Sequence, residues 1–251
     1  MDRGYVLHSY PYRETSLILQ VWTEAHGRLG LVAKGARRPK SANRSLLVPF
    51  QPLSLDWFGR GELKTLKTAE PGGPGLPLAG AALLAAFYLN ELLLKLTHRD
   101  DPHEALFAAY DDAISALREL SKGAARSTRL APEAVEPVLR RFEVRMLREL
   151  GYALELAREA GTHEPIVAER EYHYLVERGP VPAPEGREPG ANAVRLRGLT
   201  LQHLERGQFD DPATCAQAKH LMRLIINHFL DGEELATRSL VRDLQRIGEG
   251  A

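Results

Sequence analysis

The stretch SLILQVWTEAHGRLGLVA, residues 16–33, has the pattern of two short strands joined by a turn. Both halves are rich in Leu and Val, with Ile, Trp and Thr in the first, and these residue types favour strands. His26-Gly27 lies between the halves and is expected to form the turn. Similar runs, separated by Gly, Pro or Asn, occur at residues 5–8, 52–58 and 63–69. Residues 4–70 are therefore expected to be rich in strands.

Five short strands in so short a segment suit a small closed barrel, because closure removes the unpaired edges of a sheet. We expect the five-stranded OB barrel. An SH3-like barrel is the main alternative, and the number of strands alone does not separate the two.

The stretch EPGGPGLP, residues 70–77, interrupts all regular structure and marks the expected domain boundary. After it the apolar period changes from 2 to 3.6, which predicts helices. The expected fold class is therefore α+β, with an OB barrel in residues 1–77 and a helical bundle domain in residues 78–251. The predicted helices cover residues 78–98, 101–120, 132–150, 199–206, 212–230 and 235–247.

Residues 152–197 differ from the rest of the helical domain because proline and glycine crowd them. We expect an irregular insertion here, with one strand at residues 171–176 and a short hairpin.

Charge is distributed unevenly along the chain. The 251 residues have a formal net charge of zero, which by itself argues against a bulk polyanion binder. Residues 1–70, however, hold 11 Lys and Arg against 6 Asp and Glu, and the remaining residues hold 22 against 27. This asymmetry predicts a basic N-terminal module on a mildly acidic body.

The single cysteine, Cys215, allows no internal disulfide and no Cys-based zinc site, which fits a reducing compartment. It falls early in a predicted helix and is interpreted as a small buried residue. No signal peptide is visible after Met1. The most apolar run, residues 78–96, contains Asn90, Glu91 and Lys95, so it is interpreted as a buried helix rather than a membrane span. We expect a cytoplasmic protein with no membrane partner.

No constellation of residues supports catalysis. The sequence has neither a P-loop nor a Gly-x-Ser-x-Gly elbow. His98, Asp100, Asp101 and His103 form a close cluster that a metal-dependent enzyme would use, but Asp101 capping the next helix explains it better. Two pairs of acids at helical spacing are interpreted as solvated carboxylates: Glu133 with Glu136, and Glu155 with Glu159. We expect no enzymatic activity, cofactor or metal.

The strongest signal is the stretch LVAKGARRPKSANRS, residues 31–45, which turns from a strand into a basic loop without any acid. Its Gly, Pro, Ser and Asn residues are expected to exclude regular structure. Cationic grooves with aromatic faces hold single-stranded nucleic acid, and this pattern favours such binding over a merely solvated loop. The aromatic residues of the module are Tyr5, Tyr10, Tyr12, Trp22, Phe50, Trp57 and Phe58. The candidate DNA-binding residues are Lys34, Arg37, Arg38, Lys40, Arg44, Arg60, Lys64 and Lys67.

A second basic pattern lies in the helical domain. Arg140, Arg141, Arg145 and Arg148 recur along one predicted helix, and Lys219 and Arg223 are four residues apart in another. They form either surface charge paired with nearby glutamates or the rim of an apolar groove for an acidic peptide that ends in a carboxylate. The pattern alone favours surface charge.

The sequence resembles the RecO family of bacterial recombination mediators over nearly its whole length. The resemblance is carried by VLHSYPYRETSLILQVWTEAHGRLGLVAKGARRPKS, GRGELKTLKTAEP, FYLNELLLKL, LRRFEVRMLRELGYALEL and AKHLMRLIINHFLDGEELATRSL, in this order.

The resemblance implies an N-terminal OB domain, a helical domain and no enzymatic turnover. It implies binding of single- and double-stranded DNA, annealing of complementary strands, and loading of RecA, with the partner RecR, onto DNA coated by the single-strand binding protein SSB. It makes Lys34, Arg37, Arg38 and Lys40 a DNA-contact segment. It also matches Arg140, Lys219 and Arg223 to basic positions of the family, which makes an SSB-tail site more credible than the pattern alone does. The candidate SSB-tail residues are Arg140, Arg141, Lys219 and Arg223.

One departure from the family concerns zinc. Many members carry four zinc-binding cysteines in the region that corresponds to residues 157–185, and this sequence has none there. We therefore expect local packing, or a hairpin around Tyr172 and Tyr174, to hold the insertion. The alternative function is a scaffold whose OB barrel binds protein while partners supply the DNA contact.

Overall fold

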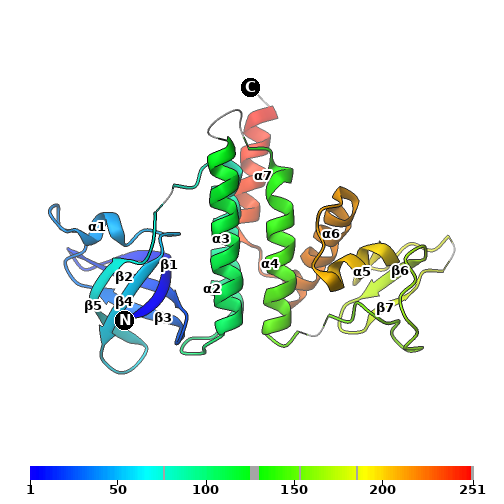
Figure 1. The fold of residues 1–251 in the computed structure, drawn as a ribbon, viewed down its shortest axis with the longest axis horizontal. Coiled ribbons are helices and arrows are strands. Elements are labelled where there is room, and N and C mark those ends of the chain that lie inside the picture. The colour runs from blue at the N-terminus through cyan, green and yellow to red at the C-terminus, as the bar shows by residue number, and fades with distance from the viewer. Residues whose placement is uncertain (76, 125–129, 153, 185, 250–251) are drawn as a thin grey trace. The chain divides into compact units, whose positions relative to one another are not determined.

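Figure 1 shows the fold in a computed structural model, which describes residues 1–75, 77–124, 130–152, 154–184 and 186–249. The chain forms two compact units. Unit 1 comprises Met1–Leu130 and Leu235–Ala251, and unit 2 comprises Ala131–Glu234. The barrel therefore shares a unit with several helices, and the assignment of residues 1–77 as a separate domain stays a prediction.

The N-terminal strands close into a five-stranded barrel in the order β1-β2-β3-β5-β4. Its strands are β1 (Asp2–Tyr12), β2 (Ser16–Thr23), β3 (Gly27–Ala33), β4 (Leu53–Phe58) and β5 (Leu63–Pro71). Neighbouring strands are antiparallel, except that β3 and β5 run parallel. The α+β fold class and the OB-like barrel predicted from the sequence are confirmed.

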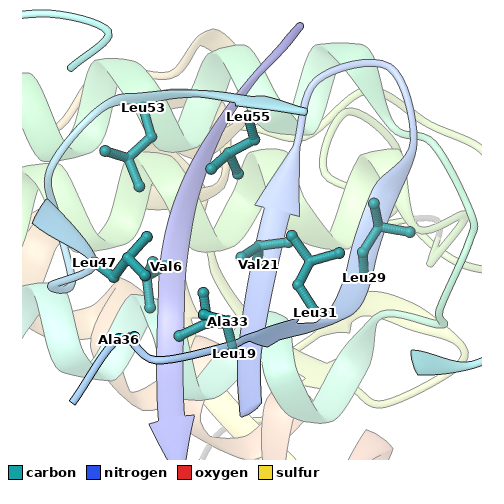
Figure 2. Packing of buried hydrophobic residues seen from close by; sticks show 10 residues of the cluster. All are labelled: Val6, Leu19, Val21, Leu29, Leu31, Ala33, Ala36, Leu47, Leu53 and Leu55. Atoms are coloured by element: carbon teal, nitrogen blue, oxygen red, sulfur yellow. The ribbon is translucent and has the colours of Figure 1, made fainter. Parts of the chain in front are cut away.

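Alternate residues of the strands fill the barrel, as Figure 2 shows. Leu19 and Val21 of β2 point inward, as do Leu29 and Leu31 of β3. Each of these side chains is at most 1% exposed. Burying a side chain of this size contributes roughly 1.5–3 kcal/mol, so the alternation fixes which residues are left on the outer surface of the barrel.

The loop after β3 is more ordered than the sequence suggested. A short helix, α1 (Asn43–Leu46), forms within it. The prediction that this stretch excludes regular structure is therefore wrong at its C-terminal end. Leu47, directly after α1, is 3% exposed in the barrel core, and this burial gives the helix a fixed attachment.

Three helices complete unit 1: α2 (Gly80–Leu96), α3 (Glu104–Ala124) and α7 (Ala236–Glu249). Tyr5 of β1 packs edge-on against Tyr110 of α3, with ring centroids 5.2 Å apart. Asn90 of α2 donates to the carbonyl of Leu7 at 2.8 Å, which ties α2 to β1.

Glu91 of α2 caps the last helix of unit 1. Its carboxylate accepts hydrogen bonds from the backbone N–H groups of Ala236 and Thr237, at 2.7 and 2.9 Å. A carboxylate at a helix N-terminus satisfies free donors and complements the helix dipole. The contact joins α7 to α2 within unit 1, although the two helices are far apart in the sequence.

The predicted cap of α3 is wrong. The helix begins at Glu104, later than expected, and its first helical bond runs from the N–H of Phe107 to the carbonyl of His103. Asp101 instead lies 3.2 Å from Nε2 of His103. Asp101 is too far upstream of the first turn to cap it.

Unit 2 contains α4 (Glu136–Glu149), α5 (Gly198–Arg206) and α6 (Pro212–Phe229). A 3-10 turn, η1 (Pro132–Val135), precedes α4, so the single helix predicted over residues 132–150 is divided. Pro137 occupies the first turn of α4, where its missing N–H costs nothing.

The insertion is more regular than the one strand and hairpin predicted. It contains a three-stranded antiparallel sheet in the order β7-β6-β8, formed by β6 (Glu171–Leu175), β7 (Gly179–Pro182) and β8 (Ala193–Arg197). The sequence GPVP of β7 resembles a loop, because proline interrupts central strands. β7 is an edge strand, however, and edges tolerate proline.

Candidate nucleic-acid interface

The basic loop, residues 34–46, is fixed to the barrel on both sides. Ala36 and Leu47 are 0% and 3% exposed within the barrel core. The backbone N–H of Arg37 donates to the carbonyl of Thr15 at 2.8 Å. Its guanidinium lies 3.4 Å from the carbonyl oxygens of Arg13 and Glu14, at the β1–β2 turn. The loop is therefore held against a neighbouring turn at one end of the barrel.

The cations of this loop are exposed, and no acid among the described residues neutralises them. Lys34, Arg37, Arg38, Lys40 and Arg44 are all exposed. In the described part of the chain, none of these five side chains forms an ion pair with an acid. Unscreened positive charge concentrated in this way attracts polyanions and raises their local concentration.

The remaining candidate residues do not extend this surface in the same way. Lys64 is paired with Asp100, and Lys67 is paired with Asp56 at 2.9 Å. The hydrogen bond from Lys67 holds the pKa of Asp56 below its usual range, so the carboxylate stays charged to lower pH than an ordinary aspartate. Both lysines therefore carry a charge that an acid already neutralises.

Arg60 is exposed but lies at the other end of the barrel. The turn that contains Arg60 precedes Leu63, which pairs with Gly30 in the middle of β3, and β5 runs parallel to β3 from there toward its end. The basic loop follows the end of β3. The structure thus brings together five of the eight candidate residues and separates Arg60 from them.

Sequence reasoning missed Arg13. This exposed residue lies at the β1–β2 turn with a φ of 52°, and its guanidinium lies 5.1 Å from the centre of the Tyr12 ring. The carbonyl of Arg13 contacts Arg37, so Arg13 adjoins the basic loop. The sequence did not indicate Arg13 as a candidate, because a single basic residue in a turn is common. Its place beside the basic loop depends on how that loop packs against the β1–β2 turn.

The aromatic residues of the barrel differ in exposure. Tyr5, Trp22 and Phe50 are buried. Tyr12 and Trp57 are half-buried. Tyr10 and Phe58 are 49% and 57% exposed, so they offer the most open ring faces to a ligand.

The candidate residues of the helical region lie in a different environment. Arg140 is 5% exposed and donates to Glu143 at 2.7 Å. Its other terminal nitrogen lies 3.8 Å from Glu136. Lys219 of α6 donates to the same Glu136 at 2.5 Å. Acids of the protein itself therefore already surround Arg140 and Lys219.

Arg141 and Arg223 are exposed on the same two helices. The guanidinium of Arg141 lies 5.8 Å from the centre of the Phe209 ring, which is a cation–π contact. Within the described residues, neither arginine has an acidic partner. The role of these four residues in binding an acidic tail stays a prediction.

Glu136 and Glu159 are not the solvated carboxylates that their spacing suggested. Only 18% of the Glu136 side chain is exposed. Glu159 is 2% exposed and does not lie in a helix. It accepts hydrogen bonds from Thr162 at 2.9 Å, Tyr172 at 3.2 Å and Arg170 at 3.4 Å. Helical spacing was misleading for Glu159 because its backbone is not helical, and for Glu136 because Arg140 and Lys219 lie against its carboxylate.

The residues of the insertion do not fit a zinc site. No cysteine occurs in residues 157–185. Among the residues that the structure describes, no group of three His, Cys, Asp or Glu side chains could hold a metal ion. The buried Glu159 carboxylate, bonded to three partners, and the buried rings of Tyr172 and Tyr174 join the segments of the insertion instead.

Cys215 is buried, as predicted. Its thiol donates to the carbonyl of Phe209 at 3.1 Å, and burial raises its pKa. A thiol with a raised pKa is a poor nucleophile at neutral pH.

The described helices include none that is both long and apolar enough to span a bilayer.

A closed five-stranded barrel of this topology, with an unneutralised basic loop, defines an OB-type protein with a nucleic-acid interface as its candidate site. Comparison with known families identifies the group more closely. Residues 1–74 match the family described as "Recombination protein O N terminal", and residues 78–238 match "Recombination protein O C terminal". The chain belongs to the RecO family of DNA repair proteins.

Several relatives are similar over nearly their full length. The DNA repair protein RecO of Nitrosospira multiformis is 46% identical over 97% of this chain and 95% of its own. The RecO protein of Azoarcus sp. is 48% identical over 97% of this chain and 96% of its own. The RecO protein of Nitrosococcus oceani is 45% identical over 99% of this chain and 95% of its own.

Proposed function

We propose that this protein is a recombination mediator that acts by binding alone, without enzymatic turnover. It binds single- and double-stranded DNA and anneals complementary strands. It engages the C-terminal tail of SSB and, together with RecR, helps to load RecA onto SSB-coated DNA. It carries out this role in the cytoplasm, at the nucleoid.

The observation that carries the proposal is the fixed basic loop with five exposed cations and no neutralising acid among the described residues. Such a surface binds phosphates by releasing condensed counterions, so affinity falls steeply with salt. Two strands held by their phosphates have their mutual repulsion reduced while their bases remain free to pair. Annealing follows from this arrangement without any catalytic group.

Binding of labelled single-stranded DNA, measured by fluorescence anisotropy over a salt series, tests the proposal. The variant Arg37→Ala/Arg38→Ala/Lys40→Ala is expected to bind more weakly. Its plot of log affinity against log salt should be shallower by about two, because each phosphate contact contributes roughly 0.7 to the slope for single strands.

A matched control removes three exposed arginines from the insertion, by Arg178→Ala/Arg187→Ala/Arg197→Ala. It changes the net charge by the same amount, so a loss restricted to the loop variant assigns binding to the loop. Equal slopes for the native protein and the loop variant would contradict the proposal. Absence of DNA binding by the native protein would favour the scaffold whose partners supply the DNA contact.

A further inference from the structure

One row of outward-facing side chains crosses the barrel beside the basic loop. Strand register pairs Tyr10 of β1 with Ile18 of β2, and Ile18 with Val32 of β3. Val32 pairs with Thr65 of β5, and Thr65 pairs with Phe58 of β4. Residues directly opposite one another in a sheet lie on the same face, so these five side chains form one continuous row.

The row lies on the outer surface because its neighbours along each strand point inward. Leu19 and Leu31, next to Ile18 and Val32, belong to the barrel core. Ile18, Val32 and Thr65 are half-buried, whereas Tyr10 and Phe58, at the two ends of the row, are exposed. The three central side chains of the row are therefore less exposed than the aromatic ring at each end.

Another part of the same outer surface shows what a covered face looks like. Trp22 follows Ile18 by four residues on β2 and pairs with Tyr5. Both residues are almost completely buried, and Tyr5 packs against Phe107 and Tyr110 of α3. The rings of Tyr10 and Phe58 are not covered by described residues to this extent, since about half of each residue is exposed. The ring of Tyr10 is contacted by that of His8, which packs edge-on with ring centroids 4.3 Å apart.

The charge beside the row indicates what would cover it. Lys34 lies directly after β3, two residues beyond Val32, and is exposed. Arg37 is held at the adjoining β1–β2 turn. The row itself contains no carboxylate. Exposed rings beside unneutralised cations complement a single nucleic-acid strand, whose bases stack while its phosphates meet the cations.

We propose that the row Tyr10–Ile18–Val32–Thr65–Phe58 is a base-stacking surface on which unpaired bases of single-stranded DNA lie against the rings of Tyr10 and Phe58. This inference rests on the proposed function, because it assumes that DNA binds at the basic loop. It adds a contact to bases, which the loop cations do not provide. The surface takes any base, because every base has a stackable face.

The test compares two labelled oligomers of equal length, oligothymidine and an abasic deoxyribose-phosphate chain. The full-length chain is used because Tyr5 packs on α3, outside the barrel. The native protein should bind oligothymidine more tightly at every salt concentration. Tyr10→Ala and Phe58→Ala should each weaken oligothymidine binding about five-fold or more, with the abasic chain and the salt slope unaffected.

Two controls separate stacking from other effects. Tyr10→Phe keeps the ring and should keep the preference for bases. Phe87→Ala removes another exposed ring of unit 1, on α2, and should also keep the preference. Melting curves of all variants exclude loss of folding.

The outcomes separate this inference from the proposed function. Equal, salt-dependent binding of both oligomers by the native protein would overturn the stacking surface and leave phosphate-led DNA binding intact. A Tyr10→Ala/Phe58→Ala variant that keeps the full preference would also overturn it, as would an equal loss in Phe87→Ala. If the native protein bound neither oligomer, the proposed function itself would fail.

Discussion

In the loop after β3, five cations project into solvent without an acidic neighbour in the described structure, whereas Arg140 and Lys219 in unit 2 both contact Glu136. The sequence shows both regions as runs of Lys and Arg. Part of the difference is local, because no acid lies within residues 31–45, whereas acids alternate with the arginines of α4. Lys219, in contrast, meets Glu136 only because α6 packs against α4. A free cation is available to a ligand, whereas a paired one must first lose its partner.

The two environments also differ in what holds the side chains in place. Arg140 is buried, so its charge depends on Glu143 for compensation. The loop cations are surrounded by water and are stable without any partner. Substitution of the buried Arg140 should therefore act mainly on stability, and substitutions in the loop mainly on binding.

The largest effect is expected from Arg140→Ala. It leaves the buried Glu143 carboxylate without its guanidinium, which should lower the free energy of unfolding by about 3–5 kcal/mol. Urea denaturation measures this loss. Arg145→Ala on the same helix removes an exposed i,i+4 pair with Glu149 and should cost at most about 0.5 kcal/mol. Similar losses for both variants would show that Arg140 is not an interior charge.

A smaller effect is expected from Glu136→Gln. Glu136 forms an ion pair with Lys219 and lies near Arg140, so its carboxylate competes with an acidic peptide for these two cations. Its neutralisation should tighten binding of an acidic peptide with a free C-terminal carboxylate about three-fold, the scale of a partly exposed ion pair. Isothermal titration with such a peptide measures the change.

The control for this variant is Glu149→Gln, which also removes one acid from α4 but releases only the exposed Arg145. It should leave peptide affinity unchanged. If both variants bound the peptide more tightly by the same factor, the effect would come from the change in net charge and not from the release of Lys219. Weaker binding by Glu136→Gln would place the peptide site away from Lys219.

The smallest effect is expected from Asp56→Asn in the barrel. Freeing Lys67 adds one uncompensated cation, which should raise DNA affinity about two-fold at low salt and steepen the salt dependence. Anisotropy measures both quantities. Glu119→Gln, which frees Lys122 on α3, is the matched control and should have no effect.

The pH dependence of the same pair has a definite sign. Lys67 lowers the pKa of Asp56, so the pair is fully formed above the ordinary pKa of an aspartate and is lost as the pH falls through the lowered value. At neutral pH the pair is therefore closed. Protonation of Asp56 would free Lys67, so any gain in DNA affinity from the loss of this ion pair should occur only at acidic pH. The gain should be absent in Asp56→Asn, where Lys67 is already free.

Much of the fold was readable in the sequence because its periodicities are strong. The residue pattern of 16–33 predicted two strands joined by a turn, which are β2 and β3, and the change of period after residues 70–77 predicted the helices. Predictions failed where short polar signals outweighed tertiary context. Residues 179–182, with two prolines, resemble a loop but form an edge strand, and Asp101 resembles a cap but lies too far from α3.

The sequence by itself determined the barrel, the helices and the charge of the basic loop, because these depend on local pattern and composition. Only the tertiary structure decided which cations remain free, since ion pairs such as Lys64–Asp100 and Lys219–Glu136 join residues far apart in the chain. It also decided which rings are exposed. Tyr5 and Tyr10 lie on the same strand, and only the packing of α3 against Tyr5 separates a core residue from a surface one.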